Sequence, residues 1–163
     1  MVQLTLKWRI QAFFCTVIAL TMLTGCIGTL FSYRGAVVAQ PDNRFAFKES
    51  DQQAVWKTNE LAVTYQYRKT SASLKISGNV KLLGGFATGF NAMKYLNVNL
   101  LFLDRQGAVI ENALIFSAGA GRRFEKTIPV PDGTDSFSFA YDGLLVDAAS
   151  YDAASCPIGY FPN

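Results

Sequence analysis

Alternation of apolar and polar residues is the feature that most constrains how this chain can fold. The segments 61–68, LAVTYQYR, and 73–80, SLKISGNV, place an apolar residue or glycine at every second position. A period of two turns one set of side chains toward a core and the other toward solvent, as in a half-buried β-strand. The same parity predicts that Tyr65 and Tyr67 lie in the core with Leu61, rather than forming a ligand platform.

Further strands are predicted in the second half of the chain, at 95–104, 108–117, 122–130 and 135–143. The first two are joined by DRQG, where Gly107 suits a left-handed backbone conformation, so they form a hairpin. The last two are joined by the turn formers of PDGT, and Phe137, Phe139 and Tyr141 share one face of the final strand.

The sequence predicts six or seven short strands, and after the N-terminal segment no long stretch has the apolar spacing of a helix. These two features define the expected fold class. They predict a mainly β protein with a single antiparallel β-sandwich of immunoglobulin-like or related topology, and a small β-barrel is the alternative. Residues 35–50 mix short apolar runs with turn formers, which is typical of a tether leading into a first edge strand. In the segment 50–59, Ser50 and Gln53 have capping-box spacing, which favours one or two helical turns that pack Trp56 onto the domain.

The N-terminus has the layout of an export signal. Lys7 and Arg9 precede an apolar run at 10–23 that contains no charged residue. The uncharged stretch continues to Phe31, which makes 20 residues from Ala12, and about 20 such residues suffice to span a bilayer. A cleaved signal and an uncleaved helical anchor therefore compete.

The residues that end this run are Leu23, Thr24, Gly25 and Cys26. This motif resembles the lipobox of bacterial lipoproteins, in which Leu and small residues precede an invariant Cys. In that family the Cys thiol receives a diacylglyceryl group, a dedicated peptidase cuts before it, and the new amine is often acylated. The resemblance implies lipidation at Cys26 and favours the lipoprotein interpretation over the anchor and over an ordinary cleaved signal.

The same resemblance implies a location and a domain organisation. In lipoproteins of two-membrane bacteria, Asp after the lipidated Cys tends to retain the protein in the inner membrane, so Ile27 implies carriage to the outer membrane, facing the periplasm or the cell surface. The expected parts are a signal peptide at 1–25, a tether and edge segment at 26–59, and the sandwich at 60–163. An uncleaved anchor would instead leave the protein in the inner membrane.

Histidine is absent from the sequence, which contains three cysteines. His-based catalytic triads and most zinc sites are thereby excluded. Cys15 leaves with the signal and Cys26 carries the lipid, so Cys156 has no partner for a disulfide within its own chain. A buried or inert thiol is the favoured interpretation, and an intermolecular disulfide or a reactive sulfur is the alternative. Without lipidation, a Cys26–Cys156 disulfide becomes possible.

Acidic residues late in the chain are the remaining candidates for a metal or a catalytic site: Asp132, Asp135, Asp142, Asp147 and Asp152. Loop carboxylates of this kind bind calcium in some proteins, and paired carboxylates hydrolyse glycosides. EF-hand spacing is absent, and turn-forming, solvating Asp residues are the favoured interpretation. We therefore expect no enzyme, no metal and no cofactor.

Two loops carry the candidate partner contacts. In LLGGFATGF, at 82–90, Phe86 and Phe90 are possible aromatic anchors, with a core-covering loop as the alternative. In SAGAGRRFE, Arg122 and Arg123 are a possible clamp for a carboxylate or phosphate, although a solvated strand start is favoured. Thirteen basic and twelve acidic residues follow the signal, a net charge of +1, so nucleic acid is not expected as a partner.

The expected function is that of a lipid-anchored, non-enzymatic accessory or scaffold subunit of the cell envelope that acts through protein contacts. Confinement to a membrane raises the effective concentration of a partner held there. A module for a small apolar or glycan ligand is the first alternative, and a signal-anchored subunit of a membrane complex is the second. The runs FLDRQGAVI, FEKTIPVP and FSFAYDG loosely resemble small extracytoplasmic sandwich domains of bacterial lipoproteins, and this resemblance implies no functional residue.

Overall fold

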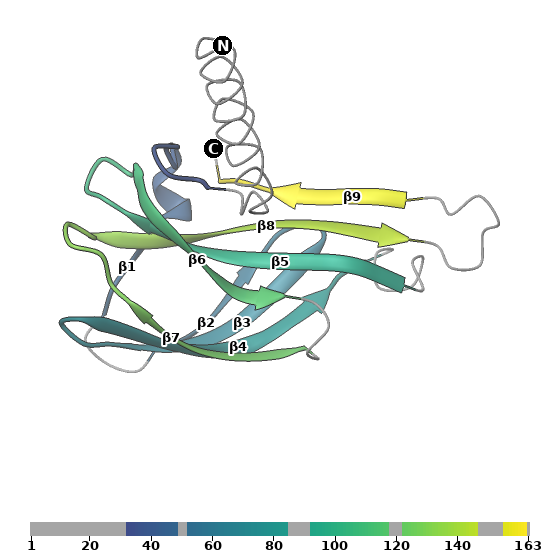
Figure 1. Cartoon of the computed structure of the whole chain (residues 1–163), viewed down its shortest axis with the longest axis horizontal. Coiled ribbons are helices and arrows are strands. Elements are labelled where there is room, and N and C mark those ends of the chain that lie inside the picture. The colour runs from purple at the N-terminus through teal and green to yellow at the C-terminus, as the bar shows by residue number, and fades with distance from the viewer. Residues whose placement is uncertain (1–31, 49–51, 85–91, 118–121, 147–154, 163) are drawn as a thin grey trace, which may run out of the picture. The chain divides into compact units, whose positions relative to one another are not determined.

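The computed structural model of the chain describes residues 32–48, 52–84, 92–117, 122–146 and 155–162. Tyr33–Asn163 forms one compact unit. Its strands lie in two antiparallel sheets stacked on each other, which confirms the predicted β-sandwich (Figure 1). A 3-10 turn, η1 (Pro41–Asn43), precedes the first strand. Within the described ranges, no helix has the length and apolar character needed to cross a membrane.

Sheet I is built around β8 (Ser136–Val146). On one side of β8 lie β5 (Ala92–Leu103) and then β6 (Val109–Ser117). Its other side is shared by two strands, β1 (Phe45–Ala46) and β9 (Ser155–Tyr160), which pair with opposite halves of β8.

Sheet II has the order β2 (Gln52–Lys57), β3 (Leu61–Lys69), β4 (Ser73–Leu82) and β7 (Arg123–Pro129). The first three strands follow one another as a meander. The fourth enters from sheet I, because the connection after β6 crosses between the sheets and the connection after β7 crosses back. The residues that β7 places beside β4 are therefore far from β4 in sequence.

The predicted hairpin and its turn are confirmed. β5 and β6 pair in antiparallel register, and Gly107 has a φ of 87°, the left-handed conformation expected of it. The Asp104 carboxylate closes the turn by accepting hydrogen bonds from the backbone N–H groups of Gln106 and Ala108, both at 2.9 Å. The turn formers of PDGT carry the chain from sheet II to sheet I.

Outside the clear alternation, one prediction was wrong and one strand was not predicted. The segment expected to form helical turns is strand β2, in which Ala54 and Trp56 face inward and Val55 faces solvent. Trp56 pairs with Val63 of β3, and its ring centroid lies 5.2 Å from that of Phe139. These contacts favour a strand more strongly than the capping-box spacing favours a helix. Strand β9 was not predicted, because its Pro and Gly residues weaken a strand signal and are tolerated at a sheet edge.

Aromatic side chains fill the space between the sheets. Phe137 and Phe139 of β8 face Tyr65 and Tyr67 of β3, with ring centroids 4.9 Å apart for Tyr65 and Phe139 and 5.3 Å apart for Tyr67 and Phe137. Tyr65 is 4% exposed and Tyr67 6% exposed, which confirms their predicted place in the core. Each of these rings removes a large apolar area from water and adds edge-to-face attraction.

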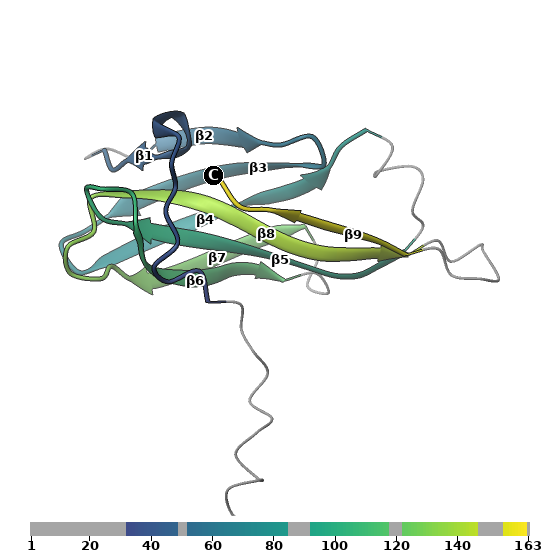
Figure 2. The same cartoon turned by 90° about the horizontal axis from the view of Figure 1, so that it is seen from above.

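A strap of residues 33–40 crosses the outer side of sheet I, over β8, β5 and β6 (Figure 2). Val38 is fully buried in a small second core beneath the strap, and its backbone N–H donates to the Gly107 carbonyl at 2.9 Å. The Arg44 guanidinium donates to the Val38 carbonyl at 2.8 Å and packs over Gly107. The strap is thereby fixed to the β5–β6 turn.

Gly78 is the position of sheet II where a side chain fits least. A Cβ built there collides first with the Thr64 carbonyl oxygen, and it lies 2.9 Å from the Phe124 ring and 3.0 Å from the Tyr65 Cα, because Gly78 pairs with Tyr65 on one side and Phe124 on the other. We predict that Gly78→Ala lowers the free energy of unfolding by about 1–3 kcal/mol, the range typical of overpacking. Urea unfolding followed by circular dichroism measures this loss.

Gly159→Ala is the matched control for that substitution, since its Cβ meets only the Tyr141 carbonyl at an ordinary 3.5 Å. We expect it to change the stability by less than about 0.5 kcal/mol. Equal losses for the two variants would contradict close packing at Gly78 as the cause.

Candidate functional site

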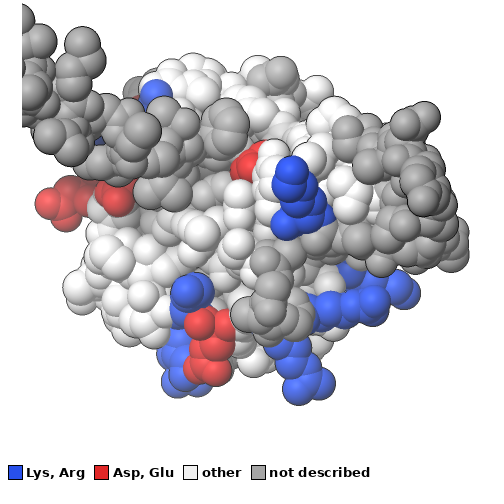
Figure 3. All heavy atoms as spheres, turned by 45° about the vertical axis from the view of Figure 1, so that its right-hand side comes forward, with Lys and Arg blue, Asp and Glu red and all other residues white. Residues whose placement is uncertain are grey.

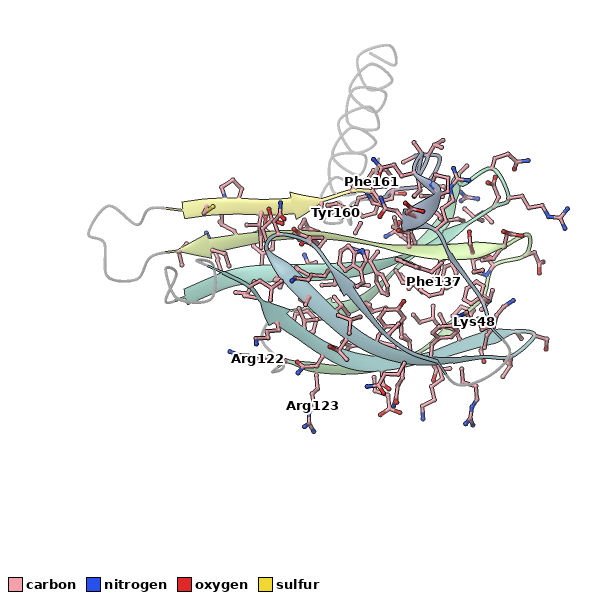
Figure 4. The ribbon with its side chains drawn as sticks, turned by 180° about the vertical axis from the view of Figure 1, so that it is seen from behind. Lys48, Arg122, Arg123, Phe137, Tyr160 and Phe161 are labelled. Carbon is pink, nitrogen blue, oxygen red and sulfur yellow. The ribbon has the colours of Figure 1, made fainter. Side chains whose placement is uncertain are left out.

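Several residues singled out in the sequence lie outside the described part of the chain: Leu23, Thr24, Gly25, Cys26, Phe86, Phe90, Asp147 and Asp152. Arg122 and Arg123 are described, and both are exposed where β7 begins. Figure 4 shows Arg123 pointing away from the body of the sandwich, on the side of sheet II. This arginine belongs to a larger polar surface.

That surface is the outer face of sheet II. Because side chains alternate along each strand and one set packs in the core, the other set is aligned on the opposite side. The outward positions are Gln53, Val55 and Lys57 of β2; Ala62, Thr64, Gln66 and Arg68 of β3; Lys75, Ser77, Asn79 and Lys81 of β4; and Arg123, Glu125 and Thr127 of β7.

The strand register arranges these side chains in rows that cross all four strands. One row is Gln53, Gln66, Ser77 and Glu125, and the next is Val55, Thr64, Asn79 and Arg123. Within the first row, the Gln66 amide donates to the Ser77 hydroxyl at 3.2 Å. Side chains directly opposite in antiparallel strands lie close enough to act together on one ligand.

An open groove of about 650 Å³ lies over these two rows. It is lined by Gln53, Thr64, Tyr65, Gln66, Ser77, Gly78, Asn79, Arg123, Phe124 and Glu125. Three amides, two aliphatic hydroxyls and two ionic groups share this lining with Tyr65, Gly78 and Phe124, so the groove offers hydrogen-bond donors and acceptors beside apolar surface. A second hollow, of about 230 Å³, shares Gln66 and Ser77 and continues toward Arg68 and Lys75.

The charges of the sandwich are distributed unevenly between its sheets. The strands of sheet II carry seven Lys and Arg residues and one Glu, whereas those of sheet I carry one Lys, one Glu and one Asp. Figure 3 shows Lys and Arg side chains gathered along the lower part of the molecule, with carboxylates between them. The five cations that point outward are Lys57, Arg68, Lys75, Lys81 and Arg123.

Glu125 is the acidic residue of this face within the described strands, and it lies beside Lys75. Their Nζ and Oε1 atoms are 2.8 Å apart, and both side chains are more than half exposed. The hydrogen bond from Lys75, and then its positive charge, lower the pKa of the Glu125 carboxyl. Because both side chains are exposed, the pair offsets only part of the positive charge at Lys75, and Lys57, Lys81 and Arg123 add to the field over the groove.

The outer face of sheet I differs, because the strap covers part of it and its polar groups bond to one another. The Asn97 amide donates to Asp142 at 3.2 Å and accepts from the Ser117 hydroxyl at 3.0 Å. Burial, and then the negative charge of Asp142, raise the pKa of Tyr33 in the strap. Tyr95 remains 40% exposed on this side.

A partly buried polar cluster joins the two sheets at the β2–β3 turn. The Tyr141 hydroxyl donates to the Glu60 carboxylate at 2.5 Å and lies 3.2 Å from the Thr58 hydroxyl. Burial, and then the hydrogen bond with Glu60, raise the pKa of Tyr141. The rings of Trp56 and Tyr160 pack against the Tyr141 ring, so the cluster ties the two sheets together.

The acidic residues considered for a metal do not converge in the described part of the chain, where no group of three or more Asp, Glu or Cys residues is arranged to hold an ion. Asp135 lies 3.8 Å from Arg105 across two turns, and Asp142 accepts from Asn97. Cys156 is half-buried in β9, opposite Leu145, and makes no disulfide with any described residue.

The chain was compared with models of protein families, with curated proteins and with solved structures, and none of the three comparisons gave a match.

The sequence pattern pointed to Arg123 but not to the other outward residues of sheet II. A signal was present, because Lys57, Arg68, Lys75 and Lys81 all occupy the solvent parity of their strands. Which of them share one face, however, depends on strand pairing, and β7 is paired with β4 across more than 40 residues of sequence.

The buried tyrosines generate a prediction about pH. Burial, and then the charge of Tyr67, raise the pKa of Tyr65 to about 12, while an unfolded tyrosine titrates near ~10. The folded state therefore holds this proton more tightly, so the stabilisation is complete below about pH 10 and is lost as the pH rises toward about 12.

We expect the free energy of unfolding to fall over that window, and the fall to be smaller in Tyr65→Phe. Absorbance at 295 nm should show Tyr65 titrating above pH ~10, where an unfolded tyrosine titrates. Titration of Tyr65 near pH ~10, measured as the difference between the wild type and Tyr65→Phe, would contradict this shift.

Proposed function

We propose that the chain is a lipid-anchored, non-enzymatic accessory protein of a bacterial cell envelope that holds an acidic partner on the outer face of sheet II. The proposed contact surface is supported by the alignment of five cations around a groove that contains polar side chains. The observation behind the anchor is the lipobox-like sequence that ends at Cys26. The contact surface keeps Arg123 from the loop expected at 118–123 and takes the place of the loop at 82–90, which lies largely outside the described residues.

The electrostatics of this surface favour an acidic partner. Cations aligned on one face produce a positive potential that steers anionic groups toward it and suppresses cationic competitors. Polar groove residues then fix the orientation by hydrogen bonds. The covered and internally bonded outer face of sheet I lacks this combination within the described strands.

A lipid on Cys26 would keep the sandwich close to the membrane. Six residues separate Cys26 from Tyr33, where the compact unit begins. A chain of that length reaches at most about 25 Å when fully extended. Two or three acyl chains hold a protein on a bilayer durably, so partners at the same surface are met at high effective concentration.

The anchor is tested by the intact mass of the protein extracted from membranes, beside Cys26→Ala. We expect a chain that starts at Cys26 and carries acyl mass, and we expect this species to be lost in the variant. An unmodified, full-length mass would overturn lipidation and support the signal anchor instead.

The contact surface is tested by photo-crosslinking in intact envelopes. A crosslinking amino acid at Gln66, in the groove, should give adducts, whereas the same group at Leu114 of sheet I serves as the control. Leu114 is 41% exposed, so adducts at this position measure only how easily the crosslinking group is reached on the sandwich surface. Adducts from Leu114 without adducts from Gln66 would place the partner elsewhere and contradict the proposed surface.

A further inference from the structure

We propose that the partner held by the outer face of sheet II is an acidic polysaccharide, a chain of sugars that bears carboxylates. This inference rests on the proposed function and names the chemistry of its partner. It is carried by three observations: the groups that line the groove, the spacing of the cations around it, and the hollow that extends it.

The groove lining matches the hydrogen-bonding character of a sugar. A sugar hydroxyl both donates and accepts, and so do the amides of Gln53, Gln66 and Asn79 and the hydroxyls of Thr64 and Ser77. These five side chains lie in two adjacent rows, so they present a continuous field of donors and acceptors. An acidic protein segment could also use the cations of this face, and the experiment below includes an acidic peptide to separate the two.

Arg123 is the cation placed to take a carboxylate from such a chain. It lies opposite Asn79 in the strand register, lines the groove and points outward (Figure 4). A guanidinium presents paired N–H groups that bind a carboxylate in a bidentate manner, which a lysine does not do. Arg123 and Asn79 together would then bind a carboxylate and a neighbouring hydroxyl of one sugar.

The remaining cations are spaced for a polymer rather than for a single small anion. Lys75 and Lys81 are six residues apart on β4, which is about 20 Å along a strand. The second hollow continues the groove past Gln66 and Ser77 in the direction of Lys75. A chain with a carboxylate on successive sugars can reach Arg123 and the lysines at the same time.

Glu125 influences where on this face a carboxylate of the ligand binds. Its carboxylate lies in the row of Ser77, next to the row of Arg123, and is held by Lys75 at 2.8 Å. It repels an anion in its own row and so favours binding at Arg123. Removing its charge should therefore strengthen the binding of a polyanion, in contrast to every substitution that removes a cation.

The experiment measures binding of the detergent-extracted full protein to oligogalacturonate by calorimetry. Dextran serves as the neutral sugar and polyglutamate as the acidic peptide. We expect binding of oligogalacturonate alone, weakened as salt rises above about 0.1 M because the charges become screened. Arg123→Ala should weaken the binding of oligogalacturonate about tenfold, as expected for the loss of a charge-assisted bidentate contact. Arg123→Lys should keep only part of the wild-type affinity.

Lys126→Ala is the matched control. It removes the same charge from the same strand, but Lys126 is opposite Ile76 and has the parity of the inner face. We expect no change of affinity in this variant and a gain of affinity in Glu125→Gln. Urea unfolding of each variant separates a loss of binding from a loss of fold.

Four outcomes would overturn the inference: polyglutamate binding as tightly as oligogalacturonate, dextran binding equally well, no binding of any probe, or equal losses in Arg123→Ala and Lys126→Ala. The first points to an acidic protein and leaves the proposed contact surface intact. The crosslinking experiment tests the contact surface and the mass measurement tests the anchor, each independently of the sugar. A wrong polysaccharide assignment can therefore be told apart from a wrong proposed function.

Discussion

The layer of aromatic rings between the two sheets is the interaction on which the rest of the structure depends. Phe137 and Phe139 from sheet I interlock with Tyr65 and Tyr67 from sheet II, and Trp56 closes the layer at the β2 edge. A slip of one residue in any of these strands would turn the rings to solvent and bring polar groups inside. The rings therefore fix the parity of every strand, and with it the set of side chains that points outward.

Sequence patterns predicted the parts of this fold that are encoded locally. Alternation located the tyrosines of β3 in the core, and a glycine in DRQG marked the left-handed turn at Gly107. Strand β2 was missed because its inward side chains are few, and β9 because Pro157 and Gly159 suit only a sheet edge. The inward rings of these two strands pack against distant parts of the chain, Trp56 on Phe139 and Tyr160 on Trp56, and no local pattern records such contacts.

The proposed binding face could not be predicted from the sequence for a similar reason. Its cations are separate in sequence, and residues 26–163 have a net charge of only +1. Pairing of β7 with β4 brings Arg123 beside Asn79, and the crossing of the chain between sheets is what makes that pairing possible. The lipid anchor at Cys26 remains a prediction from the sequence, because it lies outside the described residues.

The edge of β8 that is shared by β1 and β9 has a consequence for the timing of folding. Phe137 pairs with a residue near the start of the compact unit, and Tyr141 pairs with Tyr160 near its end. Sheet I is therefore completed only after the final strand has become available. Folds dominated by such non-local pairing form slowly, because the entropy of closing long loops is lost before the contacts that compensate for it are made.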